Sequence, residues 1–148
     1  MNDKALVDVI ATLARLTDQA LPEDAAEDSF DLTDVLLDKP GEFMRSPVIM
    51  HSINGTFAIR MDQWKLIAGS GSGGRGQPKS KPFDKPYQLY DLDKDPSETT
   101  NLIEENAKIA EVLERYLTIT RRIGLSRAPS EHIASKKMAK SATDRFGE

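Results

Sequence analysis

The sequence predicts an α+β fold, a four-stranded antiparallel sheet packed by a long C-terminal helix, with an extra N-terminal helix. Three observations predict it. Four short apolar stretches, separated by turn residues, lie between positions 48 and 92. A helical stripe of apolar residues follows them, and a second stripe precedes them. The length of 148 residues suits one ordinary domain with a buried core.

The N-terminal helix is expected over residues 4–16, where apolar residues recur at spacings of three and four. Asp3 is the expected N-cap. A short helix is expected over 32–37, with Asp31 as its cap and residues 39–41 as its stop. The stripe of the first helix consists of Leu6, Val9, Ile10, Leu13 and Leu16.

The sheet is expected to be a meander with four strands, over 48–53, 57–61, 64–68 and 87–92. Asn54-Gly55 is a strong signal for the first turn. Asp62-Gln63 forms the next tight connection, and residues 69–86 form a long loop. We expect Trp64 to pack beneath the long helix, because the helix must cover one face of the sheet.

The long helix is expected to run from Glu98 or Thr99 to Ile123, after a helix-start sequence at 95–98. Gly124 is a natural C-terminal stop. The apolar stripe that should face the sheet contains Leu102, Ile109, Leu113, Tyr116, Leu117 and Ile123.

Composition excludes several classes of function. The net charge of −4 disfavours nucleic acid as a partner, and no apolar run reaches the roughly 18 residues that a membrane span needs. The chain has no cysteine, which excludes disulfides, thiolate metal sites and a cysteine nucleophile. The first residues lack the pattern of a signal peptide.

Few residues could carry chemistry. His51 and His132 are the only histidines, and they lie too far apart in the sequence for a typical metal site. His51 is either a partly buried structural residue or a substrate contact or proton donor. The aspartates at 91, 93 and 95 resemble the start of an EF-hand loop, but Pro96 and Leu102 stand where glycine and glutamate are needed. We therefore interpret these aspartates as a turn and a helix cap.

The glycine-rich loop over 69–76 has two interpretations. It does not end in the Gly-Lys-Ser/Thr of a P-loop, so it is either a flexible linker or a loop whose backbone amides face an anion. In the second case Arg75 would add positive charge. Composition and spacing alone show no nucleophile–base pair and no metal cluster.

Several segments, taken in order, resemble the C-terminal region of bacterial arylsulfatase-type sulfatases, which have an alkaline-phosphatase-like main domain. The segments are 7–13, 21–24, 28–32, 51–67, 71–74, 88–102 and 124–127. The resemblance implies a four-stranded subdomain with a long helix, attached to a large main domain that hydrolyses sulfate esters. Asp62 stands where that family usually has glycine, and aspartate tolerates the left-handed conformation that the turn needs.

The resemblance also implies boundaries and cofactors. Residues 1–45 would be a helix and acidic lead-out from the missing main domain, 46–124 the C-terminal subdomain, and 125–148 a polar tail with a helix near 131–140. A full-length relative would be periplasmic or secreted and would use calcium and a formylglycine made within Cys/Ser-x-Pro-x-Arg. Residues 126–130 hold those ingredients in the wrong order. We therefore assign no catalytic residue, no metal ligand and no cofactor to this chain, and leave open whether it is an enzyme.

The resulting hypothesis is the C-terminal part of a sulfatase, inactive alone, which shapes the rim of the substrate pocket in the whole enzyme. The rim candidates are His51, Ser52, Asn54, Gly71, Gly73, Gly74 and Arg75. Expected partners are the missing main domain, the sulfate ester substrate and, through residues 4–16, a second copy. A free-standing, non-catalytic binding or assembly domain is the alternative. A related hydrolase of phosphate or phosphonate esters is a third option.

Overall fold

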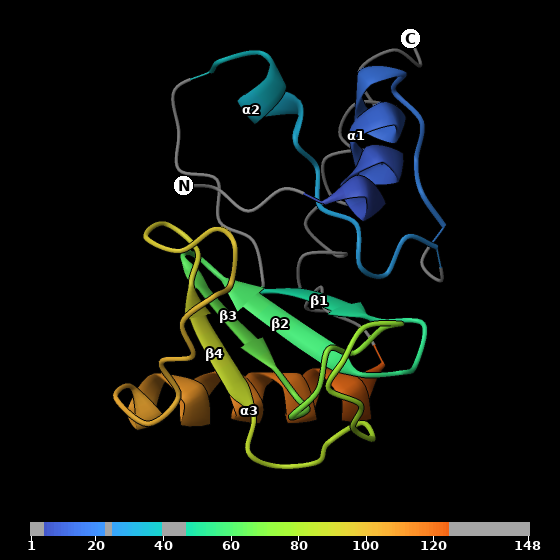
Figure 1. Ribbon diagram of the computed structural model, residues 1–148. Coiled ribbons are helices and arrows are strands. Elements are labelled where there is room, and N and C mark those ends of the chain that lie inside the picture. Colours follow the sequence, from blue (N-terminus) through green and yellow to red (C-terminus); the bar gives the residue numbers. More distant parts are fainter. Residues whose placement is uncertain (1–4, 23–24, 40–46, 125–148) are drawn as a thin grey trace, which may run out of the picture. The chain divides into compact units, whose positions relative to one another are not determined.

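The computed structural model describes residues 5–22, 25–39 and 47–124. These residues form two compact units, one over 5–39 and one over 47–124, which we describe separately (Figure 1). The sequence predictions for Asp3, for the helix stop at 40–41, and for the tail over 125–148 with its helix and His132 lie outside the described residues.

The unit over 47–124 contains a four-stranded sheet and one long helix. The strands are β1 (Val48–His51), β2 (Phe57–Met61), β3 (Trp64–Ile67) and β4 (Gln88–Asp91). They pair in chain order, and every pair is antiparallel. The helix α3 (Ala107–Ile123) packs across one face of the sheet (Figure 1). Together with the N-terminal helix described below, this confirms the predicted fold class.

The core lies between α3 and that face of the sheet. One row across the strands joins Ile49, Ile59, Leu66 and Leu89, each opposite the next in register. Buried residues of α3 cover the row, namely Ala110, Leu113 and Leu117. Each fully buried side chain of this kind contributes about 1.5–3 kcal/mol through the hydrophobic effect. Trp64 packs against the same cluster, which agrees with the prediction that it belongs to the core between sheet and helix.

The long helix starts later than predicted. Instead of Glu98 or Thr99, it begins at Ala107. The Asp95 carboxylate does cap backbone groups, but it accepts the N–H groups of Thr99 (2.7 Å) and Thr100 (2.8 Å) in a turn rather than in a helix. Glu98 has a φ of +57°, a left-handed value that a regular right-handed helix excludes.

The predicted apolar stripe of this helix is correspondingly wrong at several positions. Leu102 precedes α3, and its N–H donates to the Leu89 carbonyl at 2.8 Å, which fixes this segment beside β4. Tyr116 and Ile123 are exposed, whereas Ala110, which the stripe omitted, is buried. The helix ends at Gly124 in a left-handed conformation (φ +81°), as predicted.

The hairpin turns explain the strand ends. β1 ends at His51 rather than at residue 53, because Ser52 and Thr56 close the turn through a backbone bond of 2.9 Å. Gly55 occupies that turn with a φ of +78°. Asp62 occupies the next turn with a φ of +53°, which confirms that aspartate serves there in place of glycine.

The unit over 5–39 contains two helices. A 3₁₀ turn (Leu6–Asp8) leads into α1 (Val9–Leu16), and α2 (Thr33–Leu36) follows. Both predicted helices are therefore present, with shorter bounds. Asp8 accepts the Ala5 N–H at 2.8 Å before α1. Asp31 accepts the Thr33 N–H at 2.8 Å, but the N-cap position of α2 is Leu32, so Asp31 lies one residue before the capping position that was predicted for it.

In this unit α1 turns its polar side inward. Asp8 is fully buried and accepts the Phe30 N–H at 3.1 Å. Thr12 is also buried, and its hydroxyl accepts the Leu32 N–H at 3.0 Å. The segment that follows the acidic loop is thus held against α1 by directional hydrogen bonds, which satisfy its backbone donors.

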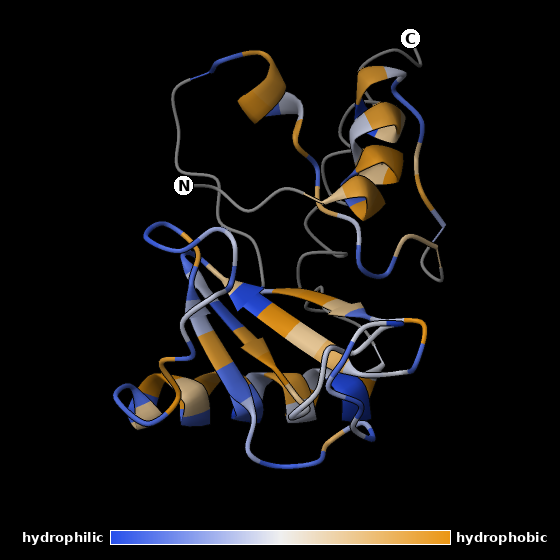
Figure 2. Ribbon diagram, viewed as in Figure 1, coloured by the Kyte–Doolittle hydropathy of each residue, from blue (hydrophilic) through white to orange (hydrophobic). Residues whose placement is uncertain are grey.

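The apolar side of α1 is left at the surface, where Figure 2 shows a largely hydrophobic helix. Leu6 is 91% exposed, and the other stripe residues are about half exposed, namely Val9, Ile10, Leu13 and Leu16. Such a contiguous apolar face is typical of an element that packs against a partner. Within the described part of the chain, no helix is both long and apolar enough to cross a membrane.

Candidate functional site

Two loops that are distant in the sequence meet at one end of the sheet (Figure 1). The first is the β1–β2 turn over 52–56. The second is the whole loop over 69–86, which begins with the glycine-rich stretch 69–76 and is called the glycine-rich loop from here on. The Asn54 side-chain amide donates to the Gly74 carbonyl at 2.8 Å. A Cβ built on Gly73 would lie 3.5 Å from the Ser52 hydroxyl. We call these two segments the loop cluster.

The β1–β2 turn is rigid for its length. Ser52 donates its N–H to the Thr56 carbonyl at 2.9 Å, and its hydroxyl accepts the Thr56 N–H at 3.2 Å. The Gly55 N–H donates to the Ser52 carbonyl at 2.9 Å. Three bonds within five residues hold Asn54 exposed at the tip, with its amide available to the second loop.

The glycine-rich loop is anchored at its base by β4. The Gln88 amide donates to the carbonyls of Gly69 (2.7 Å) and Gly71 (3.0 Å). The Ser72 N–H donates to the Pro78 carbonyl at 2.9 Å, which closes the loop on itself. A Cβ on Gly71 would lie only 2.6 Å from that carbonyl, so glycine is required there. These contacts favour a folded loop over the flexible-linker interpretation.

His51 lies at the edge of the loop cluster, and its side chain is exposed rather than partly buried. Its Nδ1 is 3.1 Å from the Ser52 carbonyl, which can only accept, so Nδ1 carries a proton. In the neutral ring Nε2 is then an acceptor, which can receive a hydrogen bond from a hydroxyl group. The imidazole ring also contacts the Phe57 ring, with 5.7 Å between the two ring centroids.

The loop cluster is electrostatically positive. The glycine-rich loop holds four basic residues and one acidic residue, Asp84. Lys79 Nζ donates to the Gly74 carbonyl at 3.0 Å, which fixes one cation beside Asn54. Arg75 is exposed and makes no hydrogen bond or ion pair with another described residue. This charge, with several backbone amides nearby, favours an anionic ligand.

The sequence interpretation missed three residues beside the loop cluster. The guanidinium of Arg121, in the last turn of α3, lies over the rings of Phe57 (4.7 Å) and Phe83 (4.2 Å). Its spacing from Leu113 and Leu117, four residues per step, places it at the exposed end of the row of α3 residues that faces the sheet. That spacing was the signal that could have identified it.

The loop cluster does not fit the calcium or formylglycine that the family resemblance implies. Its charged groups are four basic side chains and a single carboxylate, Asp84, whereas calcium prefers a cage of several carboxylate and carbonyl oxygens. Among the described residues no group of three or more His, Asp or Glu could hold a metal ion. Asp91 instead pairs with Lys94 at 2.9 Å, and this hydrogen bond holds the pKa of Asp91 below its usual value.

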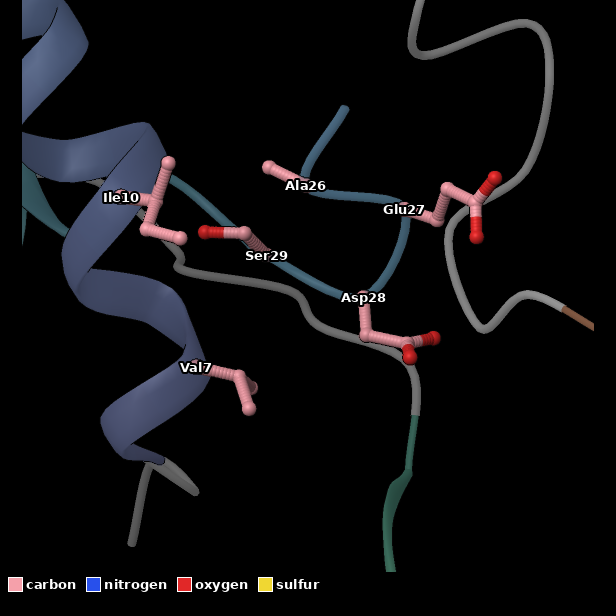
Figure 3. A pocket seen from close by; sticks show the side chains of 6 residues that line it. All are labelled: Val7, Ile10, Ala26, Glu27, Asp28 and Ser29. Atoms are coloured by element: carbon pink, nitrogen blue, oxygen red, sulfur yellow. The ribbon is translucent and has the colours of Figure 1, made fainter. Parts of the chain in front are cut away.

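A separate pocket lies in the unit over 5–39 (Figure 3). It is lined by α1 and the loop that precedes Phe30, through Val7, Ile10, Ala26, Glu27, Asp28 and Ser29. Figure 3 shows the small side chains Ala26 and Ser29 directed toward the helix, with the two carboxylates directed away. An apolar wall beside carboxylates is a poor receptor for an anion, so the loop cluster is the better candidate site.

Comparison with known proteins identifies what this chain resembles. It is 35% identical over 122 residues to the N-acetylgalactosamine-6-O-sulfatase of Bacteroides thetaiotaomicron, which covers 75% of this chain and 22% of the relative. No family model matches the chain. The match to the curated relative covers 22% of its length, so this chain spans less than a quarter of that protein.

Two solved structures of similar proteins also match this chain over about a quarter of their own length. A structure described as BT33336S-sulf, from a study of glycosaminoglycan metabolism by Bacteroides thetaiotaomicron, is 32% identical with a TM-score of 0.63, over 78% of this chain and 24% of that one. BT4656 with its substrate D-glucosamine-2-N,6-O-disulfate is 22% identical with a TM-score of 0.56, over 78% and 23%. At that identity the second likeness shows the fold alone.

Proposed function

This chain is similar to the C-terminal region of sulfatases, and we propose that its loop cluster forms part of the substrate-pocket rim of a sulfuric ester hydrolase. The observation that carries the proposal is the bond between Asn54 and Gly74. It joins the two segments in which all the rim candidates lie or, for His51, adjoin. The relatives' names support the reaction class, and the contact between the two loops supports the proposed location of the substrate.

The chemistry of the loop cluster suits a sulfated sugar. The sulfate group carries a negative charge that cations and backbone N–H groups can bind, and Arg75 and the glycine-rich loop offer both. Neutral sugar hydroxyls need acceptors and donors of moderate strength, which His51 and the Asn54 region supply. The curated relative is named for the 6-sulfate of N-acetylgalactosamine, and we propose a sulfated amino sugar as the substrate class.

The proposed enzyme requires a main domain that supplies the nucleophile and the metal. Calcium and formylglycine belong to that part of the proposal, because the described residues offer no cage for the ion and the chain has no cysteine. The exposed apolar face of α1 is the surface that we propose to pack against the main domain. This chain on its own is then inactive, since it lacks an activated nucleophile.

Binding to the 148-residue chain tests the rim proposal directly. The ¹⁵N-labelled chain is titrated with N-acetylgalactosamine 6-sulfate, and the backbone amides of residues 52–56 and 69–76 should shift together. The unsulfated sugar should cause no comparable shift, because it lacks the anion. Equal shifts from both sugars, or no shift at tens of millimolar ligand, would refute the rim role.

A phosphorylated sugar separates the related-hydrolase alternative. The 6-phosphate of the same amino sugar carries a second negative charge near neutral pH, whereas the sulfate carries one. Tighter binding of the phosphate at the same amides would favour a phosphate ester as the substrate. The sulfatase proposal expects binding of the sulfate ester to be at least as tight.

The free-standing binding domain is a second candidate, favoured by one observation. The unit over 47–124 has its own core, with Ile59, Leu66, Leu89 and Leu113 all fully buried. A unit with its own buried core can fold without a further domain. Hydrogen exchange separates the two functions, since full protection of residues 4–16 in a strictly monomeric chain would favour the free-standing domain.

A further inference from the structure

The guanidinium of Arg121 lies over two neighbouring aromatic rings, Phe57 and Phe83, which we call the aromatic platform. The centroids of Phe57 and Phe83 are 5.8 Å apart, and the guanidinium carbon lies 4.7 Å and 4.2 Å from them. Both rings pack against the core cluster, so the platform itself is anchored. Both rings lie within cation–π distance of the guanidinium, which holds this group at the aromatic surface.

Those N–H groups are available. Arg121 is exposed and makes no hydrogen bond or ion pair with another described residue. Glu114, an acidic side chain on the same helix, is engaged with Lys85 at 3.3 Å. A guanidinium is a planar fork of N–H donors, so one that is held over two rings with its donors unused can bind a carboxylate or a sulfate through two parallel hydrogen bonds.

The platform is continuous with the loop cluster through His51. The His51 ring contacts Phe57, and its Nδ1 approaches the carbonyl of Ser52, the first residue of the β1–β2 turn. Arg121, Phe57, His51 and Ser52 therefore form one connected series of contacts. A ligand that occupies the loop cluster could extend along this series toward the guanidinium.

We propose that Arg121 binds a second oxyanion of an acidic saccharide, a sulfate or a carboxylate on the residue next to the one held by the loop cluster. The proposal rests on the proposed rim function and adds a specificity for saccharides with more than one anionic group. Phe57 and Phe83 act as positioning residues, since they hold the guanidinium without themselves contacting the anion.

The test uses the 148-residue chain and two disaccharides. One carries a 6-sulfated amino sugar linked to a uronate, and the other replaces the uronate by a methyl ester and adds a sulfate to the same ring. Dissociation constants come from titrations followed at backbone amides of the loop cluster and at the Arg121 Nε–H signal. Inorganic sulfate is the third probe.

Arg121→Gln should weaken binding tenfold or more, because it removes a charge-assisted pair of hydrogen bonds. Arg121→Lys should recover only part of the affinity, since an ammonium lacks the planar fork. Arg122→Gln is the matched control, with the same change of charge one residue further along α3, and should alter the constant less than twofold. A loss confined to the uronate probe identifies a carboxylate, and a loss confined to the disulfated probe identifies a sulfate.

Three results would overturn the proposal. Equal constants for the native chain and Arg121→Gln with both disaccharides, while the loop amides still shift, would remove the second subsite and leave the rim function intact. An equal weakening by Arg122→Gln would show a general charge effect. Inorganic sulfate that binds Arg121 as tightly as the disaccharides would show that the saccharide adds nothing. No shift at any loop amide would instead refute the rim function itself.

Discussion

Gly71→Ala is the substitution that most directly tests the fold of the glycine-rich loop. The added Cβ would lie 2.6 Å from the Pro78 carbonyl oxygen and 2.7 Å from the Ser80 backbone nitrogen. Ordinary contacts of carbon need about 3.5 Å, so the two strands of the loop must separate by about 1 Å. That movement strains the Ser72 bond to Pro78 and the Gln88 bond to Gly71.

The expected cost is about 1–3 kcal/mol, the usual penalty for overpacking where backbone has to move. For a unit of this size this corresponds to a drop in melting temperature of roughly 5–20 °C. Trp64 is the only tryptophan and lies in β3, so its fluorescence during urea unfolding reports on this unit specifically.

Gly74→Ala is the matched control in the same loop. A Cβ there would meet nothing nearer than the Ser72 carbonyl at 4.0 Å. The stability should therefore change by less than about 1 kcal/mol, in either direction. If Gly71→Ala and Gly74→Ala have the same small effect, the close approach of the two halves of the loop is wrong.

Three further predictions concern the core, acid stability and association. Leu113→Ala should cost about 2–5 kcal/mol in urea unfolding, whereas the neighbouring Val112→Ala, 47% exposed, should cost less than about 0.5 kcal/mol. The Thr100 N–H lowers the pKa of the Asp95 carboxyl, so this contribution to stability is present above about pH 4 and lost as pH falls through the lowered pKa. Thermal unfolding between pH 5 and 2 should show that loss, and a profile unchanged by Asp95→Asn would contradict it. Sedimentation should show self-association at micromolar concentration that Leu13→Lys abolishes, and a native chain monomeric at every concentration would contradict it.

Much of the sheet could be predicted because its signals are local. Asn54-Gly55 and Asp62 determine where the chain reverses, and alternation along β2 assigns Ile59 to the covered face. The start of α3 could not be predicted in the same way. Aspartate is a common N-cap residue, so Asp95 predicts a helix start. Here it caps a turn instead, because the segment that follows is hydrogen-bonded to β4 through Leu102.

The candidate site was predictable only in part, for a related reason. The glycine-rich loop and Asn54 are visible in the sequence as unusual turn chemistry. Arg121 has no unusual local context, and what makes it distinctive is the pair of rings that the tertiary fold brings beneath it. Side chains recruited from three separate elements become a site only when packing joins them.

The inward polar side of α1 implies that its two faces are under different constraints. Asp8 and Thr12 satisfy backbone donors of the following segment, so substitutions there damage the unit itself. Leu6 and Leu13 are exposed and contribute little to the unit's own stability, so polar substitutions there affect mainly contacts outside the unit. The loss of stability on polar substitution of Leu6 or Leu13 thus measures how far the unit depends on a partner. The loss on substitution of Asp8 or Thr12 is the reference value, because those residues stabilise the unit itself.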